Sequence, residues 1–180
     1  GTAPAVAGNR APNVPRAAPA TTGGSAGQTA NRGCIPNFVA GIGAGYPTHV
    51  VTGSKVIVIA QEENHKVRRI YLDGEHPKDL KPTIYGHSIG RWEGDTLVVD
   101  TAKLMAGTLF NNGVDYTEDV HLSERFRLAD ENTLVVTQQF EDAGSFDGTA
   151  ARIMSFRRGD DHVYPYDCDP TYGLAIDSRQ

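Results

Sequence analysis

Apolar and polar residues alternate along most of the chain after Val50, a pattern typical of strands with one buried face. The alternation is interrupted by short turn sequences containing Gly, Asn and Asp, which predicts hairpins. We predict four hairpins in succession, at 55–63 with 66–74, 83–92 with 96–101, 120–128 with 133–142, and 149–158 with 162–168. Two turn residues, Asn64 and Gly94, are expected to supply a positive φ. No stretch has a convincing long helical period.

Hairpins that follow one another favour an up-and-down order, because neighbours in sequence are usually neighbours in a sheet. Closing such a sheet removes its exposed edges. We therefore predict an all-β fold, an antiparallel up-and-down barrel of about eight strands, a size that leaves room for one small ligand. A β-sandwich is the main alternative.

Residues 1–33 have a different composition and are predicted to form an extended, low-complexity arm, with 34–180 as the barrel domain. The arm holds three arginines and no acid, so the remaining 14 basic and 22 acidic residues give the domain a net charge of −8. The arm is expected to dock on the acidic body of its own subunit or of a neighbouring one, and in the second case it would join a homo-oligomer. The alternative is a solvated linker. An acidic body is a poor nucleic-acid binder. No apolar run is long enough for membrane insertion.

The segment "GHSIGRWEGDTLVVDT", residues 86–101, contains the first candidate chemistry. If Glu93 and Gly94 are the central residues of its turn, His87 lies opposite Asp100. A carboxylate in that position would orient the imidazole and raise its basicity. The alternative is a structural hairpin whose acids only cap the turn.

A second candidate is Glu124, which alternation places in an otherwise apolar row of "VHLSERFRL". A carboxylate there must be paired, or its pKa rises towards neutrality and it becomes a proton donor or acceptor. The alternative is an internal ion pair with an arginine such as Arg69 or Arg152. Because Arg68 and Arg69 are adjacent, one of them must face inward, where a guanidinium suits a carboxylate or phenolate ligand.

We predict a single pocket into which both His87 and Glu124 point. The catalytic residues are predicted to be His87, Glu124 and Asp100, and the substrate-binding residues Tyr85, Arg69, Tyr71, Trp92 and His121. The remaining histidines lie in turns or at strand ends and are expected to be solvated: His49, His65, His76 and His162. Their spacing matches no metal motif, and no nucleotide or phosphate loop is present, so neither a metal nor a cofactor is predicted.

Several segments, "VRRIYLDG", "GHSIGRWEGDTLVVDT", "HLSERFRL" and "VYPYDCDPTYGL", resemble a large, mostly uncharacterised family of exported bacterial proteins. The resemblance covers about Cys34 to Leu174 and implies a calycin or lipocalin-like β body in a periplasmic or secreted protein. An oxidising location would favour a disulfide between Cys34 and Cys168, with two buried thiols as the alternative. The family segment usually ends Tyr-x-Cys-His-Glu-Gly-Asn-Tyr, whereas Asp169-Pro170-Thr171 stands here in place of His-Glu-Gly. This departure shifts the predicted chemistry to His87, His121 and Glu124.

These features predict a cofactor-independent acid–base enzyme of lyase, isomerase or hydratase type. Its substrate would be a small apolar or aromatic molecule in the barrel pocket. One alternative is a non-catalytic, calycin-type protein that binds a small hydrophobic ligand. Another is an assembly module whose arm joins subunits. An enzyme requires at least two titratable groups that converge on one spot, whereas a carrier requires mostly apolar walls.

Overall fold

The structure, a computed structural model, describes residues 47–62, 66–109, 114–160 and 162–163. These residues contain ten strands and no helix. The strands are β1 (Thr48–Thr52), β2 (Val56–Gln61), β3 (Lys66–Leu72), β4 (His87–Glu93), β5 (Thr96–Ala102), β6 (Gly107–Leu109), β7 (Val114–Tyr116), β8 (His121–Asp130), β9 (Thr133–Glu141) and β10 (Thr149–Arg157). The predicted all-β class is therefore confirmed.

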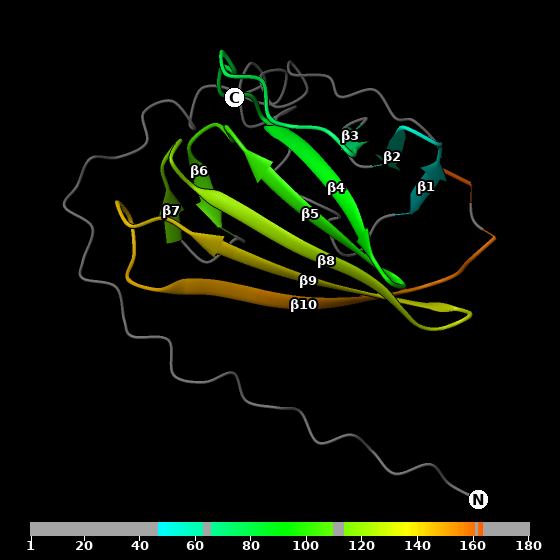
Figure 1. The fold of residues 1–180 in the computed structure, drawn as a ribbon. Helices are drawn as coiled ribbons and strands as arrows, with labels where there is room; N and C mark the ends of the chain where they lie inside the picture. The colour runs from blue at the N-terminus through cyan, green and yellow to red at the C-terminus, as the bar shows by residue number, and fades with distance from the viewer. Residues whose placement is uncertain (1–46, 63–65, 110–113, 161, 164–180) are drawn as a thin grey trace, which may run out of the picture.

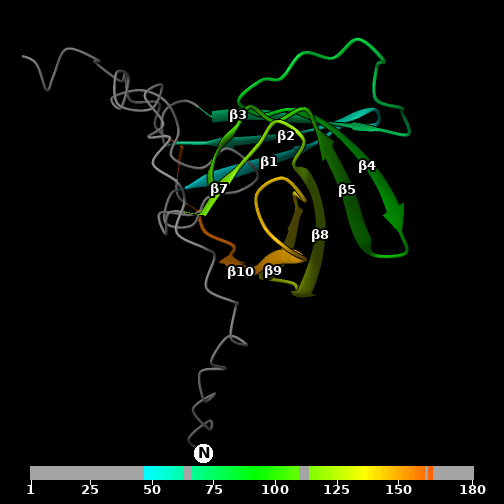
Figure 2. The ribbon, with the colours of Figure 1, turned by 90° about the vertical axis from the view of Figure 1, so that its left-hand side faces the viewer.

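Eight strands form one sheet in the order β1-β2-β3-β4-β5-β8-β9-β10, and β6 and β7 form a separate two-stranded sheet. The large sheet curls into a half-barrel, whose C-shaped section is visible in Figure 2. No pairing joins β1 to β10 within the described residues, so these two strands are its free edges. Most of the buried side chains lie on the concave face, which we call the inner face. The convex, outer face of β4, β5 and β8 is turned towards the viewer in Figure 1.

One pairing differs from the predicted order, because β3 and β4 are parallel while the other pairs are antiparallel. Parallel neighbours need a crossover connection, and the loop 73–86 carries the chain back to the end where β3 began. The prediction of a fully antiparallel sheet was wrong at this point. The prediction was based on pairings within hairpins. It contained no information on how β3 pairs with β4, because these strands belong to different hairpins.

Three of the predicted hairpins are observed, as β2–β3, β4–β5 and β8–β9. The first strand of the fourth is β10, whereas most of its second strand, 162–168, lies outside the described residues. Strand β1 and the β6–β7 hairpin were not predicted. The arm, Asn64, Cys34 and Cys168 also lie outside the described residues, so the expectations about them stay predictions.

The inner face carries two apolar clusters, and most of their strand residues alternate with residues of the outer face. The larger contains Ile57, Ile59, Ile70, Leu97, Val99, Phe126, Val136 and Met154. The smaller contains Leu104, Tyr116, Val120, Leu122 and Phe140, so β7 contributes to it through Tyr116. Burial of these side chains is the main driving force that holds the curled sheet together.

Two features of the backbone require a glycine at position 86, directly before β4. The φ of Gly86 is +59°, and an added Cβ would lie 2.5 Å from the Ala102 carbonyl oxygen. Gly94 has a similar φ of +63° but no atom within 4 Å of such a Cβ. Gly94→Ala should therefore cost only the left-handed backbone penalty, about 1–2 kcal/mol. Gly86→Ala should cost about 1–3 kcal/mol more because the strand must also shift. Urea unfolding of both variants checks this, and equal losses would contradict the close approach.

Candidate functional site

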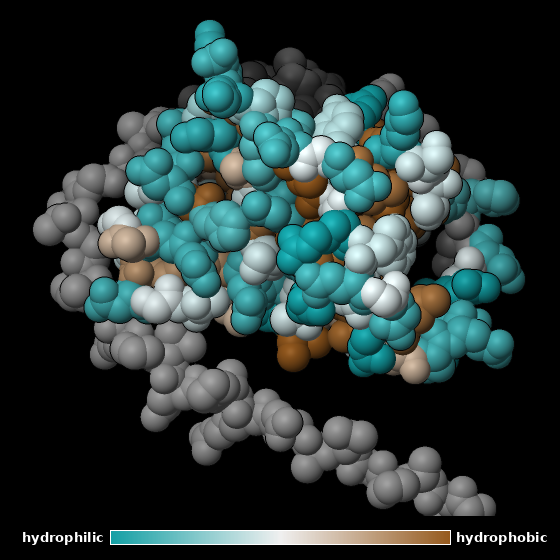
Figure 3. Space-filling view, in the orientation of Figure 1, coloured by the Kyte–Doolittle hydropathy of each residue, from teal (hydrophilic) through white to brown (hydrophobic). Residues whose placement is uncertain are grey.

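Four side chains meet on the outer face, and we call His76, His87, Asp100 and His121 the histidine–aspartate cluster. His87 begins β4, His121 begins β8, and Asp100 lies on β5 between these strands. The pairing register places all three on the same face of the sheet. His76 reaches them from the crossover loop 73–86. The outer face around these strands is largely hydrophilic in Figure 3.

The cluster forms a continuous chain of contacts. Oδ1 of Asp100 lies 2.5 Å from Nε2 of His121, which is a short hydrogen bond. Oδ2 of Asp100 lies 3.5 Å from Nε2 of His76, an ion-pair distance. On its other side, Nδ1 of His76 lies 2.9 Å from Nδ1 of His87, where one nitrogen donates and the other accepts. The carboxylate of Asp100 thus contacts two imidazoles directly, and His76 connects it to the third, that of His87.

His87 is half-buried between two rings. Tyr71 stacks on it with centroids 5.1 Å apart and an interplanar angle of 13°, and His76 meets it edge-on at 5.0 Å. Burial lowers the pKa of His87 below its ordinary value of 6.5, and the charge of His76 lowers it further. His87 is therefore neutral near pH 7, the form that can accept a proton.

The lowered pKa has a consequence for stability. The ordinary pKa of His87 is 6.5. Below this pH, the unfolded chain takes up a proton at His87 more readily than the folded chain does. Folding stability contributed by His87 is therefore present above that pH and is lost as the pH falls through the folded pKa. We expect wild type to lose more unfolding free energy between pH 8 and pH 5 than His87→Gln, measured by urea titration. His49→Gln, which removes an exposed histidine outside the cluster, is the control, and it should follow wild type.

Four of the predicted site residues meet here: Tyr71, His87, Asp100 and His121. Arg69 is exposed on the same face, and the register of β3 with β4 sets it beside His87. Trp92 lies near the other end of β4 and is 55% exposed, away from the cluster. Tyr85 is half-buried in the turn before β4.

His76 was expected to be solvated, and that expectation was wrong. Only 24% of its side chain is exposed, and it connects His87 to Asp100. Its segment, "EHPKDLKP", has no periodicity from which a contact with β4 or β5 could be predicted. The only available signal was the presence of a histidine in a long loop that follows a strand.

The predicted pairing of His87 with Asp100 was also wrong. Glu93 pairs with Thr96, so the central turn residues are Gly94 and Asp95, and His87 lies opposite Ala102. The pairing of β4 with β5 is therefore shifted by two residues relative to the prediction. Because side chains alternate with a period of two, Asp100 still shares a face with His87. It reaches His87 through His76 and not directly.

Glu124 lies on the opposite face, fully buried at 0% exposure, and is ion-paired with Arg68. Its Oε1 accepts a hydrogen bond from Nε2 of Gln138 at 2.7 Å. The internal ion pair considered as the alternative is thus the observed arrangement, with Arg68 as the inward arginine and Arg69 outward. The prediction that Glu124 and His87 share one pocket was wrong, since the sheet separates them.

The ion pair belongs to a larger set of polar side chains across the inner face. We call this set the interior polar row: Arg68, Ser88, Thr101, Glu124, Gln138 and Arg152. Arg68 donates to Oγ of Ser88 at 3.0 Å and to Oγ1 of Thr101 at 2.8 Å. Nε of Arg152 donates to Oε1 of Gln138 at 2.6 Å. Burial lowers the pKa of Arg152, and the charge of Glu124 opposes this shift. Glu124 thus serves as the counter-charge of Arg68 and as the acceptor for Gln138 on the inner face.

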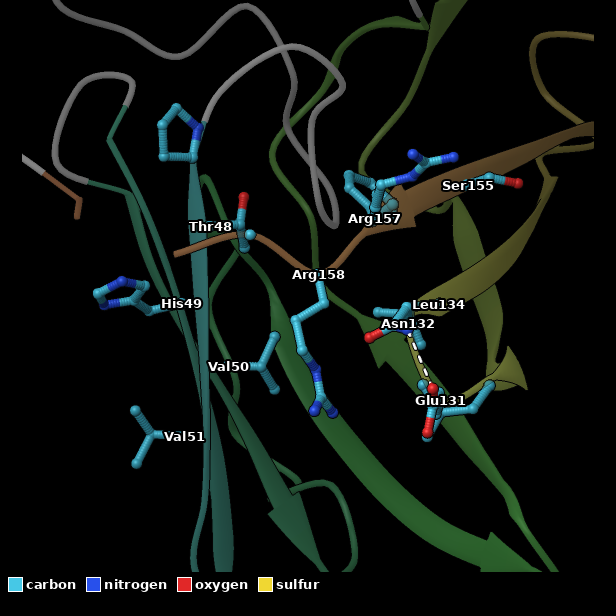
Figure 4. Close-up of a pocket in the computed structure, with 14 residues that line it drawn as sticks. Thr48, His49, Val50, Val51, Glu131, Asn132, Leu134, Ser155, Arg157 and Arg158 are labelled. Atoms are coloured by element: carbon cyan, nitrogen blue, oxygen red, sulfur yellow. Dashed lines mark hydrogen bonds between the residues drawn. The ribbon is translucent and has the colours of Figure 1, made fainter. Parts of the chain in front are cut away.

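A cavity of about 790 Å³ lies between the free edge β1 and the β9–β10 hairpin (Figure 4). Its lining includes Val50, Leu134, Phe156, Arg157 and Arg158. It opens at the gap between the two edge strands, so it is the mouth of the half-barrel. No residue predicted for the site lines it.

No three or more His, Cys, Asp or Glu side chains in the described ranges are arranged to hold a metal ion. The same residues contain no helix long and apolar enough to cross a membrane. No protein-family description, curated protein or solved structure matches this chain.

Proposed function

We propose that the protein is a cofactor-independent acid–base enzyme of lyase, isomerase or hydratase type, and that the histidine–aspartate cluster is its proton-transfer site. The observation that supports this is the chain of contacts from His121 through Asp100 and His76 to His87, with His87 kept neutral by burial. Such a set supplies both a proton acceptor and a proton donor, which these reactions need. The proposal moves the chemistry from the barrel interior to the outer face.

His87 is the base in this proposal. Its Nδ1 faces His76, so Nε2 is the nitrogen that takes the proton from the substrate. His121 is the acid, because its Nε2 is held by Asp100 and its Nδ1 remains to donate. The carboxylate of Asp100 stabilises the imidazolium formed on either side, at His76 or at His121.

The residues beside His87 indicate the substrate class. Tyr71 is 43% exposed and offers an aromatic surface next to the base. Arg69 is exposed on the same face and offers a cation for an enolate or carboxylate oxygen. A small aromatic or unsaturated carbonyl compound fits both. The periplasmic or secreted location expected from the family resemblance is part of the same proposal.

Proton exchange tests this function without knowledge of the full reaction. A panel of aromatic ketones, hydroxy acids and unsaturated acids is incubated with the protein in D₂O, and deuterium at carbon is followed by NMR. We expect exchange in at least one compound class, and His87→Gln should slow it by about 100-fold or more. Exchange that proceeds at the same rate in His87→Gln, or no exchange across the panel, would contradict the proposal. A role as a binding protein would use the cavity at the mouth of the half-barrel instead.

A further inference from the structure

We propose that the cavity at the mouth of the half-barrel binds a small amphipathic organic anion, with its apolar body inside and its carboxylate on Arg158. This site is separate from the histidine–aspartate cluster and does not depend on the acid–base proposal. The argument rests on the orientation of the side chains in the cavity, on its apolar wall and on one arginine.

Part of the cavity wall is apolar. Leu134 and Phe156 pair across β9 and β10 and pack against the larger apolar cluster. On the opposite side, the side chain of Val50 points into the cavity from β1. His49 and Val51 also belong to the lining, but their side chains point to the other face of β1 (Figure 4). Val50 is 49% exposed although its side chain lies on the inner face. The volume of about 790 Å³ is within the range of small-molecule sites.

Arg158 gives the site its charge preference. Its side chain extends into the cavity between β1 and the β8–β9 turn (Figure 4). Its backbone N–H donates to the Asn132 carbonyl oxygen at 2.7 Å, which fixes the start of the side chain. Among the described residues, the Arg158 guanidinium has no hydrogen bond or ion pair.

The other charged groups of the lining are an arginine and a glutamate. Arg157 lies at the rim, and Oε1 of Glu131 accepts a hydrogen bond from Asn132 at 3.4 Å. Two arginines and one glutamate leave the lining with one net positive charge, within a chain whose net charge is −5. A guanidinium that pairs with none of the described residues and lies beside apolar side chains is complementary to a carboxylate that carries an apolar chain or ring.

Adjacent residues of β1 provide a matched pair of variants. Val50→Asp places a negative charge inside the cavity, whereas Val51→Asp places the same charge on the side that points away. Both residues are exposed on an edge strand, at 49% and 60%, so both variants should fold. Arg158→Gln removes the proposed anion contact, and Arg125→Gln removes an exposed arginine on the outer face as its control.

Isothermal titration with decanoate, and with decanol as the neutral probe of equal chain length, tests the proposal. We expect decanoate to bind wild type more tightly than decanol. Val50→Asp and Arg158→Gln should weaken decanoate binding about tenfold or more, while Val51→Asp and Arg125→Gln leave it unchanged. Decanol binding should be insensitive to Arg158→Gln. Absence of decanoate binding to wild type, equal affinity for both probes, or equal effects of Val50→Asp and Val51→Asp would overturn the proposal.

Discussion

Replacing Glu124 by glutamine is expected to destabilise the protein by about 3–5 kcal/mol, because it leaves the Arg68 guanidinium buried without a counter-charge. The two residues are 0% and 4% exposed, so water cannot take the place of the lost carboxylate. Gln138 would also lose the carboxylate oxygen to which it donates. Urea unfolding at pH 7 measures the loss.

Two further variants separate the ion pair from a general effect of mutation. Glu118→Gln removes an exposed carboxylate and should leave the unfolding free energy near wild type. Arg68→Met combined with Glu124→Leu removes both charges and should recover part of the loss, because an apolar pair needs no counter-charge. Recovery is incomplete because Ser88 and Thr101 lose their donor. A Glu124→Gln variant as stable as Glu118→Gln would contradict the structural role of Glu124.

The second large effect is expected on turnover. With the substrate identified by deuterium exchange, His87→Gln should lower kcat/KM by about 10²–10⁴-fold. Asp100→Asn should lower it by about 10²-fold or more, because the amide cannot stabilise an imidazolium. In wild type, kcat/KM should rise with pH through a midpoint below 6.5, since His87 must be neutral and its pKa is lowered. Arg125→Gln is the control.

Arg125 lies on the outer face of β8 and donates to Glu93 at 3.1 Å, away from the cluster. Its replacement should leave turnover near wild type. Each variant is first checked by its melting temperature, so that a loss of activity is not a loss of folding. If Asp100→Asn and His87→Gln were no slower than Arg125→Gln, the cluster would have no catalytic role.

Local alternation was sufficient to predict most of the sheet. It placed β2, β3, β5, β8, β9 and β10 within a few residues and identified Glu124 as an acid in an apolar row. It also placed His87 and Asp100 on one face, since an even change of register preserves the face. These are properties of residues close in sequence, and they are visible without knowledge of long-range contacts.

The parts that could not be predicted depend on the crossover loop 73–86. The loop has no periodicity, yet it makes β3 parallel to β4 and brings Tyr71 next to His87. It also brings His76 to Asp100. Which of Arg68 and Arg69 faces inward depends on which face of β3 is turned towards the core. That is set by how β3 pairs with its neighbouring strands. Strand alternation alone says only that the two arginines face opposite ways.

The most direct test of the central claim is a map of where the substrate binds, obtained by NMR of the histidine side chains and methyl groups during titration. The account predicts that the resonances of His76, His87 and His121 shift with substrate concentration, together with the methyl of Ala102 on the same face. Methyl groups of the inner face, such as those of Ile70 and Val99, should remain unchanged. Shifts confined to the inner-face methyl groups, with silent histidines, would contradict the placement of the chemistry on the outer face.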